Sequence, residues 1–188
     1  MLTVAIGCVE NKAYQEKLKD PALYNAAMKQ LTDVIVHDIF SPPVASRVYV
    51  YPNIAAYEIM AQADPEKFIS LSGQLSDFMA IPRNQDPQVD VHLAALHAFL
   101  TVGTELIFSE DKMQAFQDQT YQALQSDGLS KRVLNSSMSY GDKVASHILK
   151  WADGDHYKQT RTDVKYTIRA QPEYWKPTPP DYMEGIEP

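Results

Sequence analysis

Residues 87–108 read PQVDVHLAALHAFLTVGTELIF, and this stretch decides the fold class. Two apolar stripes repeat in it at helical spacing: Val89, Leu93, Leu96, Leu100, Gly103 and Ile107 form one, and His92, Ala95, Phe99, Val102 and Leu106 form the other. A surface helix needs only one such stripe, so two adjoining stripes indicate a helix with neighbours on several sides. The sequence therefore predicts a central helix over 87–108, opened by Asp86-Pro87.

Amphipathic segments on both sides of this stretch supply the neighbours. Asp20-Pro21 is a strong helix start, and the apolar spacing continues from there to about Phe40. A second helix is predicted from Pro43, with a kink or a break where Pro52 removes a backbone hydrogen bond. Further helices are predicted over 65–78, 109–127 and 130–153, which gives an all-α helical bundle with a kinked second helix and an extended C-terminal arm.

The ends of the chain differ from this bundle. Leu2 to Cys8 is apolar and ends in a small residue before cysteine, as in the tail of a bacterial lipoprotein signal, although the basic n-region is missing. We expect 1–19 to be unstructured or a remnant lipoprotein-signal segment, 20–153 to be the helical bundle domain, and 154–188 to be an extended arm rich in proline and aromatic residues. We expect that arm to pack across the bundle, with one short strand as an option. A lipid anchor at Cys8 would place the protein in the periplasm or cell envelope, and without it the chain would be cytoplasmic.

Composition excludes several classes of protein. The formal charge of -7 disfavours a nucleic-acid binder, because affinity for phosphate backbones needs clustered Lys and Arg. Cys8 is the single cysteine, so the chain has no internal disulfide and no multi-thiolate zinc site. No apolar run reaches the roughly 18 to 20 residues of a membrane-spanning helix.

The spacing of the histidines argues against a metal site. His92 and His97 lie five residues apart, so their side chains point in different directions, and we expect a buried His92 and a half-exposed His97. Asp33 and His37 are spaced i, i+4, but no Glu-x-x-His partner completes a carboxylate-bridged metal site.

Other charged residues also have structural interpretations. Asp38, Arg47 and Glu58 lie on or beside apolar helix surfaces, where we expect a buried ion network, with an anion-binding Arg47 as the alternative. The run 153–155 (Asp-Gly-Asp) lacks the remaining ligands of a calcium loop and is interpreted as a helix end.

Several ordered blocks resemble one known family. The block 34–49 (VIVHDIFSPPVASRVY) followed by 53–58 (NIAAYE), then 93–96, 106–112, 157–161 and 175–182 (WKPTPPDY), resembles the N-terminal region of Bacteroidetes-type vanadium-dependent haloperoxidases, which share a superfamily with type 2 phosphatidic acid phosphatases. The resemblance covers about residues 20–188. It implies an all-helical protein that binds vanadate or phosphate.

The catalytic signature of that superfamily is absent from this sequence. Its three parts are K-x-x-x-x-x-x-R-P, P-S-G-H and S-R-x-x-x-x-x-H; Ser46-Arg47 begins like the third, but Asn53 stands where the histidine is required. We therefore assign no catalytic, cofactor-binding or metal-binding residue, and expect vanadate or phosphate only in a full-length parent.

The resemblance leads to two hypotheses about function. In the first, the chain is the N-terminal helical part of a haloperoxidase-like or phosphatase-like protein, inactive alone, whose partner is a missing C-terminal catalytic half. In the second, it is a non-enzymatic binding or scaffold module. Homo-oligomers remain an option, including one that assembles a site from Arg47, His37 and His92 of different subunits. An exposed apolar patch would favour the first hypothesis.

Overall fold

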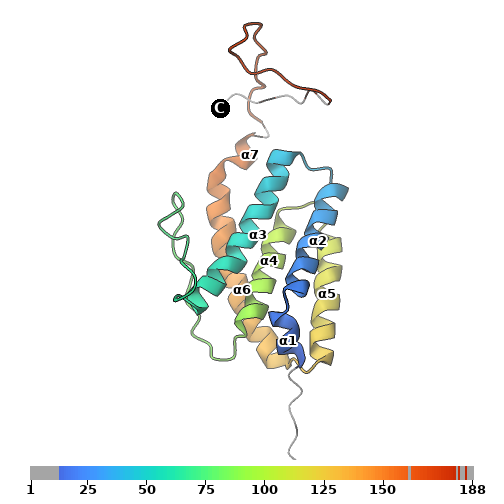
Figure 1. The fold of residues 1–188 in the computed structure, drawn as a ribbon, viewed down its shortest axis with the longest axis vertical. Coiled ribbons are helices and arrows are strands. Elements are labelled where there is room, and N and C mark those ends of the chain that lie inside the picture. The colour runs from blue at the N-terminus through green and yellow to red at the C-terminus, as the bar shows by residue number, and fades with distance from the viewer. Residues whose placement is uncertain (1–12, 161, 181, 183–184, 186–188) are drawn as a thin grey trace, which may run out of the picture. The chain divides into compact units, whose positions relative to one another are not determined.

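The computed structural model describes residues 13–160, 162–180, 182 and 185. The chain divides into two compact units, residues 1–150 and 151–188. Helices α2 (Pro21–His37), α3 (Pro42–Ala63), α4 (Val91–Glu105), α5 (Glu110–Ser126) and α6 (Lys131–Ala152) run alternately up and down as a bundle (Figure 1). The described residues contain no β-strand, which confirms the predicted all-α fold. No helix in this part of the chain is long and apolar enough to cross a membrane.

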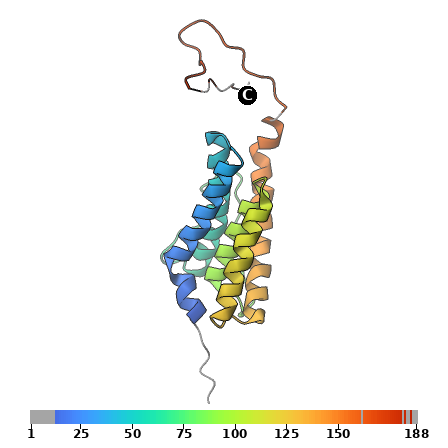
Figure 2. The same cartoon turned by 90° about the vertical axis from the view of Figure 1, so that its right-hand side faces the viewer.

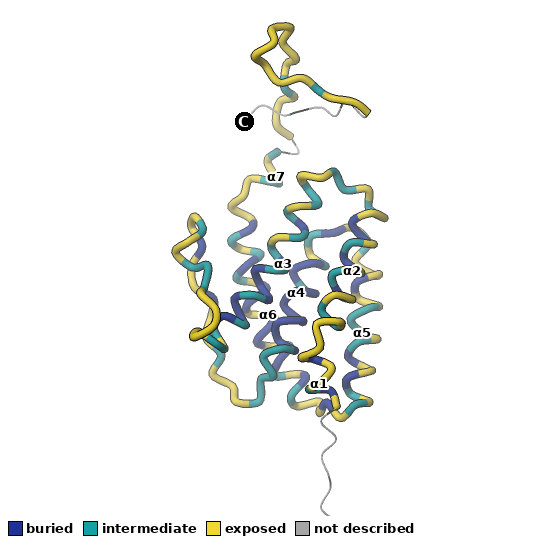
Figure 3. The backbone as a smooth tube through the Cα atoms, viewed as in Figure 1, coloured by how far each residue is buried: buried dark blue, intermediate teal, exposed yellow. Residues whose placement is uncertain are grey.

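Helix α4 is the centre of the bundle, as predicted. Ten of its 15 residues are buried, and it packs against α2, α3 and α5. Figure 3 shows the buried residues concentrated on α4 and on the inner faces of its neighbours, and Figure 2 shows the same bundle from the side. The predicted start at Pro87 was wrong, because Asp90 and not Asp86 caps this helix. Asp90 Oδ1 accepts hydrogen bonds from His92 N at 3.0 Å and Leu93 N at 3.2 Å.

Helix α3 continues through Pro52 without the break that the sequence allowed. Pro52 is buried, and its ring faces the space beside Gly103 of α4. One turn of the helix is reinforced by a side chain, since Asn53 Nδ2 donates to Tyr49 O at 2.8 Å. Packing against α4 therefore outweighs the backbone bond that proline removes.

The predicted helix over 65–78 was wrong. Residues 64–90 form turns that are tied to the bundle by side chains. Glu58, only 2% exposed, accepts from Ser70 Oγ and from Leu71 N, both at 2.7 Å, and Tyr57 Oη donates to Ile69 O at 2.8 Å. A backbone N–H that donates to a side chain of α3 cannot also donate to a carbonyl oxygen of a new helix.

The first 19 residues are not all unstructured, which corrects that prediction. Helix α1 (Ala13–Lys19) forms because Tyr14 and Leu18 are buried against the bundle, where α1 packs on α2, α4 and α5. The predicted acylation of Cys8 concerns a residue outside the described part of the chain.

The second unit begins with the last two residues of α6 and continues with a short 3-10 helix, η1 (Asp153–Asp155), and α7 (Tyr157–Thr160). Beyond them the chain forms turns, in which the rings of Tyr166 and Trp175 pack edge to face with centroids 5.5 Å apart. The run 153–155 is a helix end, as interpreted from the sequence. The packing of this arm across the bundle stays a prediction.

Candidate functional site

Three hydrogen-bonded side chains, of which Tyr121 and His97 are buried and Asp142 is exposed, join α4, α5 and α6. His97 is 3% exposed; its Nδ1 lies 2.5 Å from Tyr121 Oη and its Nε2 lies 2.7 Å from Asp142 Oδ1. A carboxylate can only accept, so His97 Nε2 carries the proton and Nδ1 accepts from the Tyr121 hydroxyl. Burial lowers the pKa of His97 even though Asp142 opposes that effect, and burial together with Asp142 and Asp118 raises the pKa of Tyr121. The imidazole is therefore held neutral.

This chain of hydrogen bonds stabilises packing and does not activate a nucleophile. Both ring nitrogens of His97 are used within the protein, and Tyr121 is 7% exposed. Sequence reasoning placed the two histidines the wrong way round, because the His92 side chain is 35% exposed and His97 is the buried one. The apolar stripes included His92 and not His97, and the burial of His97 depends on its polar partners on α5 and α6, which the stripes do not reveal.

A groove of about 590 Å³ lies beside the N-terminal end of α4. Its walls come from α1, α2, α3, α4 and the 64–90 turns, and are mainly apolar, with Leu18, Leu23, Ile54, Met60, Phe68 and Leu96 among them. Two polar groups in its wall are satisfied by each other, since Tyr24 Oη donates to Asn53 Oδ1 at 2.9 Å. Burial raises the pKa of Tyr24, so its hydroxyl stays protonated.

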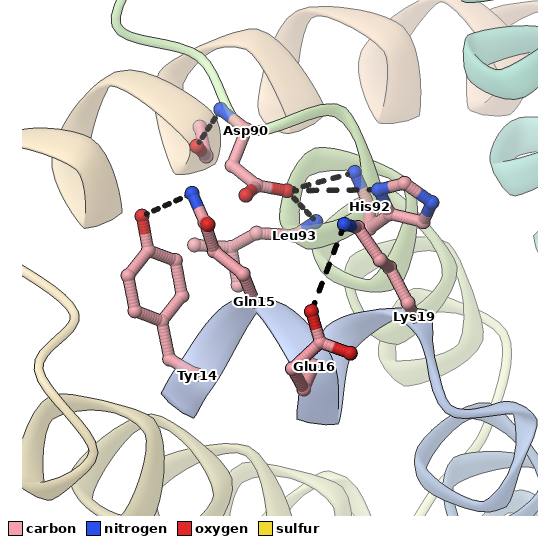
Figure 4. Close-up of polar contacts among 8 residues, drawn as sticks. Tyr14, Gln15, Glu16, Lys19, Asp90, His92 and Leu93 are labelled. Carbon is pink, nitrogen blue, oxygen red and sulfur yellow. Dashed lines mark hydrogen bonds and ion pairs between the residues drawn. The ribbon is translucent and has the colours of Figure 1, made fainter. Parts of the chain in front are cut away.

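Lys19, Asp20 and His92 are further polar residues that line the groove. Lys19 Nζ lies 3.9 Å from Glu16 Oε1, and His92 lies near Asp90 at the start of α4 (Figure 4). The Asp90 backbone N–H donates to Ser137 Oγ of α6 at 2.9 Å, which fixes the first turn of α4. The groove can hold an apolar group. It contains no pairing of nucleophile and base.

The structure separates the residues that the sequence suggested as a buried ion network. Glu58 holds the 64–90 turns, whereas Asp38 binds the start of α5, accepting from Phe108 N at 2.9 Å, Ser109 N at 3.0 Å and Ser109 Oγ at 2.5 Å. Arg47 lies with its guanidinium carbon 5.3 Å from the centre of the Tyr51 ring. The expectation of one shared network was wrong. Glu58 accepts from a backbone N–H of the 64–90 turns, whereas Asp38 accepts from backbone N–H groups of the segment that joins α4 to α5.

The other predicted candidates lie apart from these places. Asp33 pairs with Lys29 at 2.5 Å, and His37 is the last residue of α2. Within the described residues no group of three or more His, Cys, Asp or Glu could hold a metal ion. Sequence reasoning missed Tyr121 and Asp142, for which the only signal was a tyrosine on the inner face of a predicted helix.

Comparisons with known proteins identify a relative of this fold. No protein-family model matches the chain, and no curated protein matches it. A solved structure that does match is described as the crystal structure of the first bacterial vanadium-dependent iodoperoxidase. It is 42% identical over 88% of this chain, with a TM-score of 0.78, and this chain spans 40% of the iodoperoxidase chain. Sequence identity and shared fold together support a vanadium haloperoxidase-like helical domain.

Proposed function

We propose that this domain is a non-catalytic helical part of a vanadium haloperoxidase-like protein, and that another part of such a protein supplies the oxyanion pocket. The observation that carries the proposal is the 42% identity to a vanadium-dependent iodoperoxidase of which this chain spans 40%. The reaction proposed for the whole protein is peroxide-dependent oxidation of a halide. Phosphate-ester hydrolysis is the alternative from the superfamily resemblance, and no contact in the bundle favours it.

The donor set of the described residues does not fit bound vanadate. Such a site would need several Lys or Arg donors around one histidine that bonds the central atom. His97 is closed in by Tyr121 and by the carboxylate of Asp142, which would repel an oxyanion, and His147 is bonded to Met79 O at 2.9 Å. We therefore derive no reaction step from these residues, and we expect the isolated chain to be inactive.

An exposed apolar surface at one end of the bundle supports a packing partner. We call it the end patch: Val36, Ile39, Phe40 and Phe108. Val36, Ile39 and Phe108 are 72%, 88% and 69% exposed, and the rings of Phe40 and Phe108 lie with centroids 4.9 Å apart. Ile39 has a φ of 56°, a backbone region that branched side chains rarely adopt. Large apolar side chains gathered in this way favour an interface over a self-contained module.

The proposal is tested by a domain exchange with the bacterial iodoperoxidase. The purified chain, given hydrogen peroxide, iodide and vanadate, should show no turnover above buffer. A chimaera in which this chain replaces the matching part of the iodoperoxidase should fold and oxidise iodide.

Two results would contradict the proposal: iodide oxidation by the isolated chain, or a folded chimaera without iodide oxidation. Ile39→Asp in the chimaera tests the end patch, and it should weaken assembly while leaving the secondary structure of the isolated chain unchanged. Val164→Asp is the matched control, because Val164 is also exposed, at 76%, but belongs to the second unit. A dimer of the isolated chain, lost on Ile39→Asp, would instead assign the end patch to a second copy.

A further inference from the structure

A polar pocket of about 280 Å³ lies between the 83–89 loop and one face of α6. Helix α6 contributes Ser136, Ser139, Tyr140 and Lys143, whose spacings of three and four residues put them on the same face. The loop contributes Arg83, Asn84, Gln85 and Asp86 among others. In contrast to the apolar groove near α1, this pocket is lined almost entirely by hydrogen-bonding side chains.

The loop that carries Arg83 is held in place on both sides of that residue. The single hydroxyl proton of Tyr140 is shared between Gln62 Oε1, 2.9 Å from Tyr140 Oη, and Pro82 O, 3.1 Å from it. Asn84 N donates to the same Gln62 Oε1 at 3.0 Å, and Asn84 Oδ1 accepts from Asp86 N at 2.9 Å. The pocket is therefore formed without a ligand, so binding would not have to order the loop.

The charges around the pocket are mostly positive. Its one carboxylate, Asp86, accepts from Gln88 N and from the Ser136 hydroxyl, and these bonds, together with Arg132 and Lys143, lower the pKa of Asp86. Arg132 and Lys143 offset its charge, and Arg83 adds another cation. No ion pair within the described residues joins Arg83 or Lys143 to a carboxylate. Such a local excess of positive charge is notable in a chain of net charge -7.

We propose that this pocket binds a phosphate-type oxyanion through Arg83, Lys143 and the Ser139 hydroxyl. Arg83 and Lys143 would donate charge-assisted hydrogen bonds, which are stronger than bonds between neutral groups. The Ser136 hydroxyl is already used by Asp86, so Ser139 is the serine free to donate. No histidine lines the pocket, so it is a binding site and not the site of vanadium chemistry. The inference is independent of the proposed haloperoxidase-like role.

The same chemistry can come from free phosphate or from the terminal phosphate of an ester. Calorimetric titrations of the full chain with inorganic phosphate and with glycerol phosphate, at constant ionic strength, separate these sources. Tighter binding of glycerol phosphate would assign the pocket to an ester, and equal or tighter binding of inorganic phosphate would assign it to the free ion.

Substitutions then locate the site. Lys143→Gln and Arg83→Gln should each weaken phosphate binding about tenfold or more, because each removes a charge-assisted bond. Lys143→Arg should retain most of the affinity. Lys150→Gln is the matched control, since it removes the same charge seven residues along the same helix, and it should bind like the parent chain. The free energy of unfolding without phosphate should be unchanged in all four variants, because the side chains of Arg83, Lys143 and Lys150 are exposed.

Three results would overturn the proposal: no saturable binding at millimolar phosphate, unchanged affinity in both Lys143→Gln and Arg83→Gln, or an equal loss in Lys150→Gln. The last result would show that the affinity for phosphate depends only on the overall charge of the protein.

Discussion

Gly141→Ala probes the closest approach between α6 and α4. A Cβ at position 141 would lie 2.8 Å from His97 Cδ2, 2.9 Å from Ala94 O and 3.3 Å from Ala98 N. Two of these atoms belong to the backbone of α4 and cannot turn away as the end of a flexible side chain can. The added methyl group must therefore push the two helices apart.

The expected cost combines two opposing effects. Inserting one extra carbon into a packed core costs about 1–3 kcal/mol. Replacing a glycine inside a helix by alanine returns about 1 kcal/mol through backbone entropy. Because two of the three neighbours are backbone atoms, we expect the upper part of the packing range and a net loss of about 1–2 kcal/mol.

Gly103→Ala is the matched control within the same core. Its Cβ would meet Leu31 Cδ1 at 3.4 Å and Leu31 Cδ2 at 3.6 Å, which are ordinary contacts with a movable side chain. That variant should be neutral or more stable by up to about 1 kcal/mol. Urea unfolding followed by circular dichroism measures both. A Gly141→Ala chain as stable as the Gly103→Ala chain would refute the close approach between α6 and α4.

Three further changes test other parts of the bundle. Leu96→Ala, at a side chain 3% exposed on α4, should cost about 2–5 kcal/mol in urea unfolding, and a loss below about 1 kcal/mol would contradict a central α4. Asp38→Ala removes the acceptor at the start of α5 and should cost about 0.5–2 kcal/mol, read from the thermal midpoint, whereas Asp33→Ala on the exposed face of α2 should change it little. Burial keeps the pKa of His97 below its ordinary value of 6.5, so the unfolded chain binds more protons and stability should fall as the pH drops below about 6.5. The urea midpoint of His97→Gln should depend less on pH over that range, and an equal dependence would exclude His97 as the source.

The helices that the sequence predicted well are those whose apolar spacing matches their burial. The double stripe of 87–108 identified α4, and Asp20 caps α2 as predicted, with Oδ1 accepting from Ala22 N at 2.8 Å. Gly128, with a φ of 100°, ends the turn after α5 as the Asp-Gly pair indicated. Such features are local, so a single sequence is enough to reveal them.

The failures of prediction involve partners that are distant in the sequence. The Asp64-Pro65 start signal favoured a helix over 65–78, but Glu58 accepts from the backbone N–H of Leu71 and the segment forms turns. His97 was expected to be half-exposed but is buried, and its partners Tyr121 and Asp142 lie 24 and 45 residues away, where helical spacing cannot reveal them. The pocket that contains Arg83 and Lys143 also joins two distant segments, and neither segment carries a recognisable motif.

The turns of residues 64–90 have a consequence for hydrogen exchange in the native state. The amides of Leu71 and Asn84 are protected by the side chains of Glu58 and Gln62, and not by a helical ladder. Each amide can therefore exchange through a local opening that breaks one side-chain contact, while the bundle stays folded. Their exchange rates should exceed those of the α4 core, and Glu58→Gln should increase exchange at Leu71 far more than at Asn84. The 64–90 connection would then be less protected from exchange than the helices to which it is bonded.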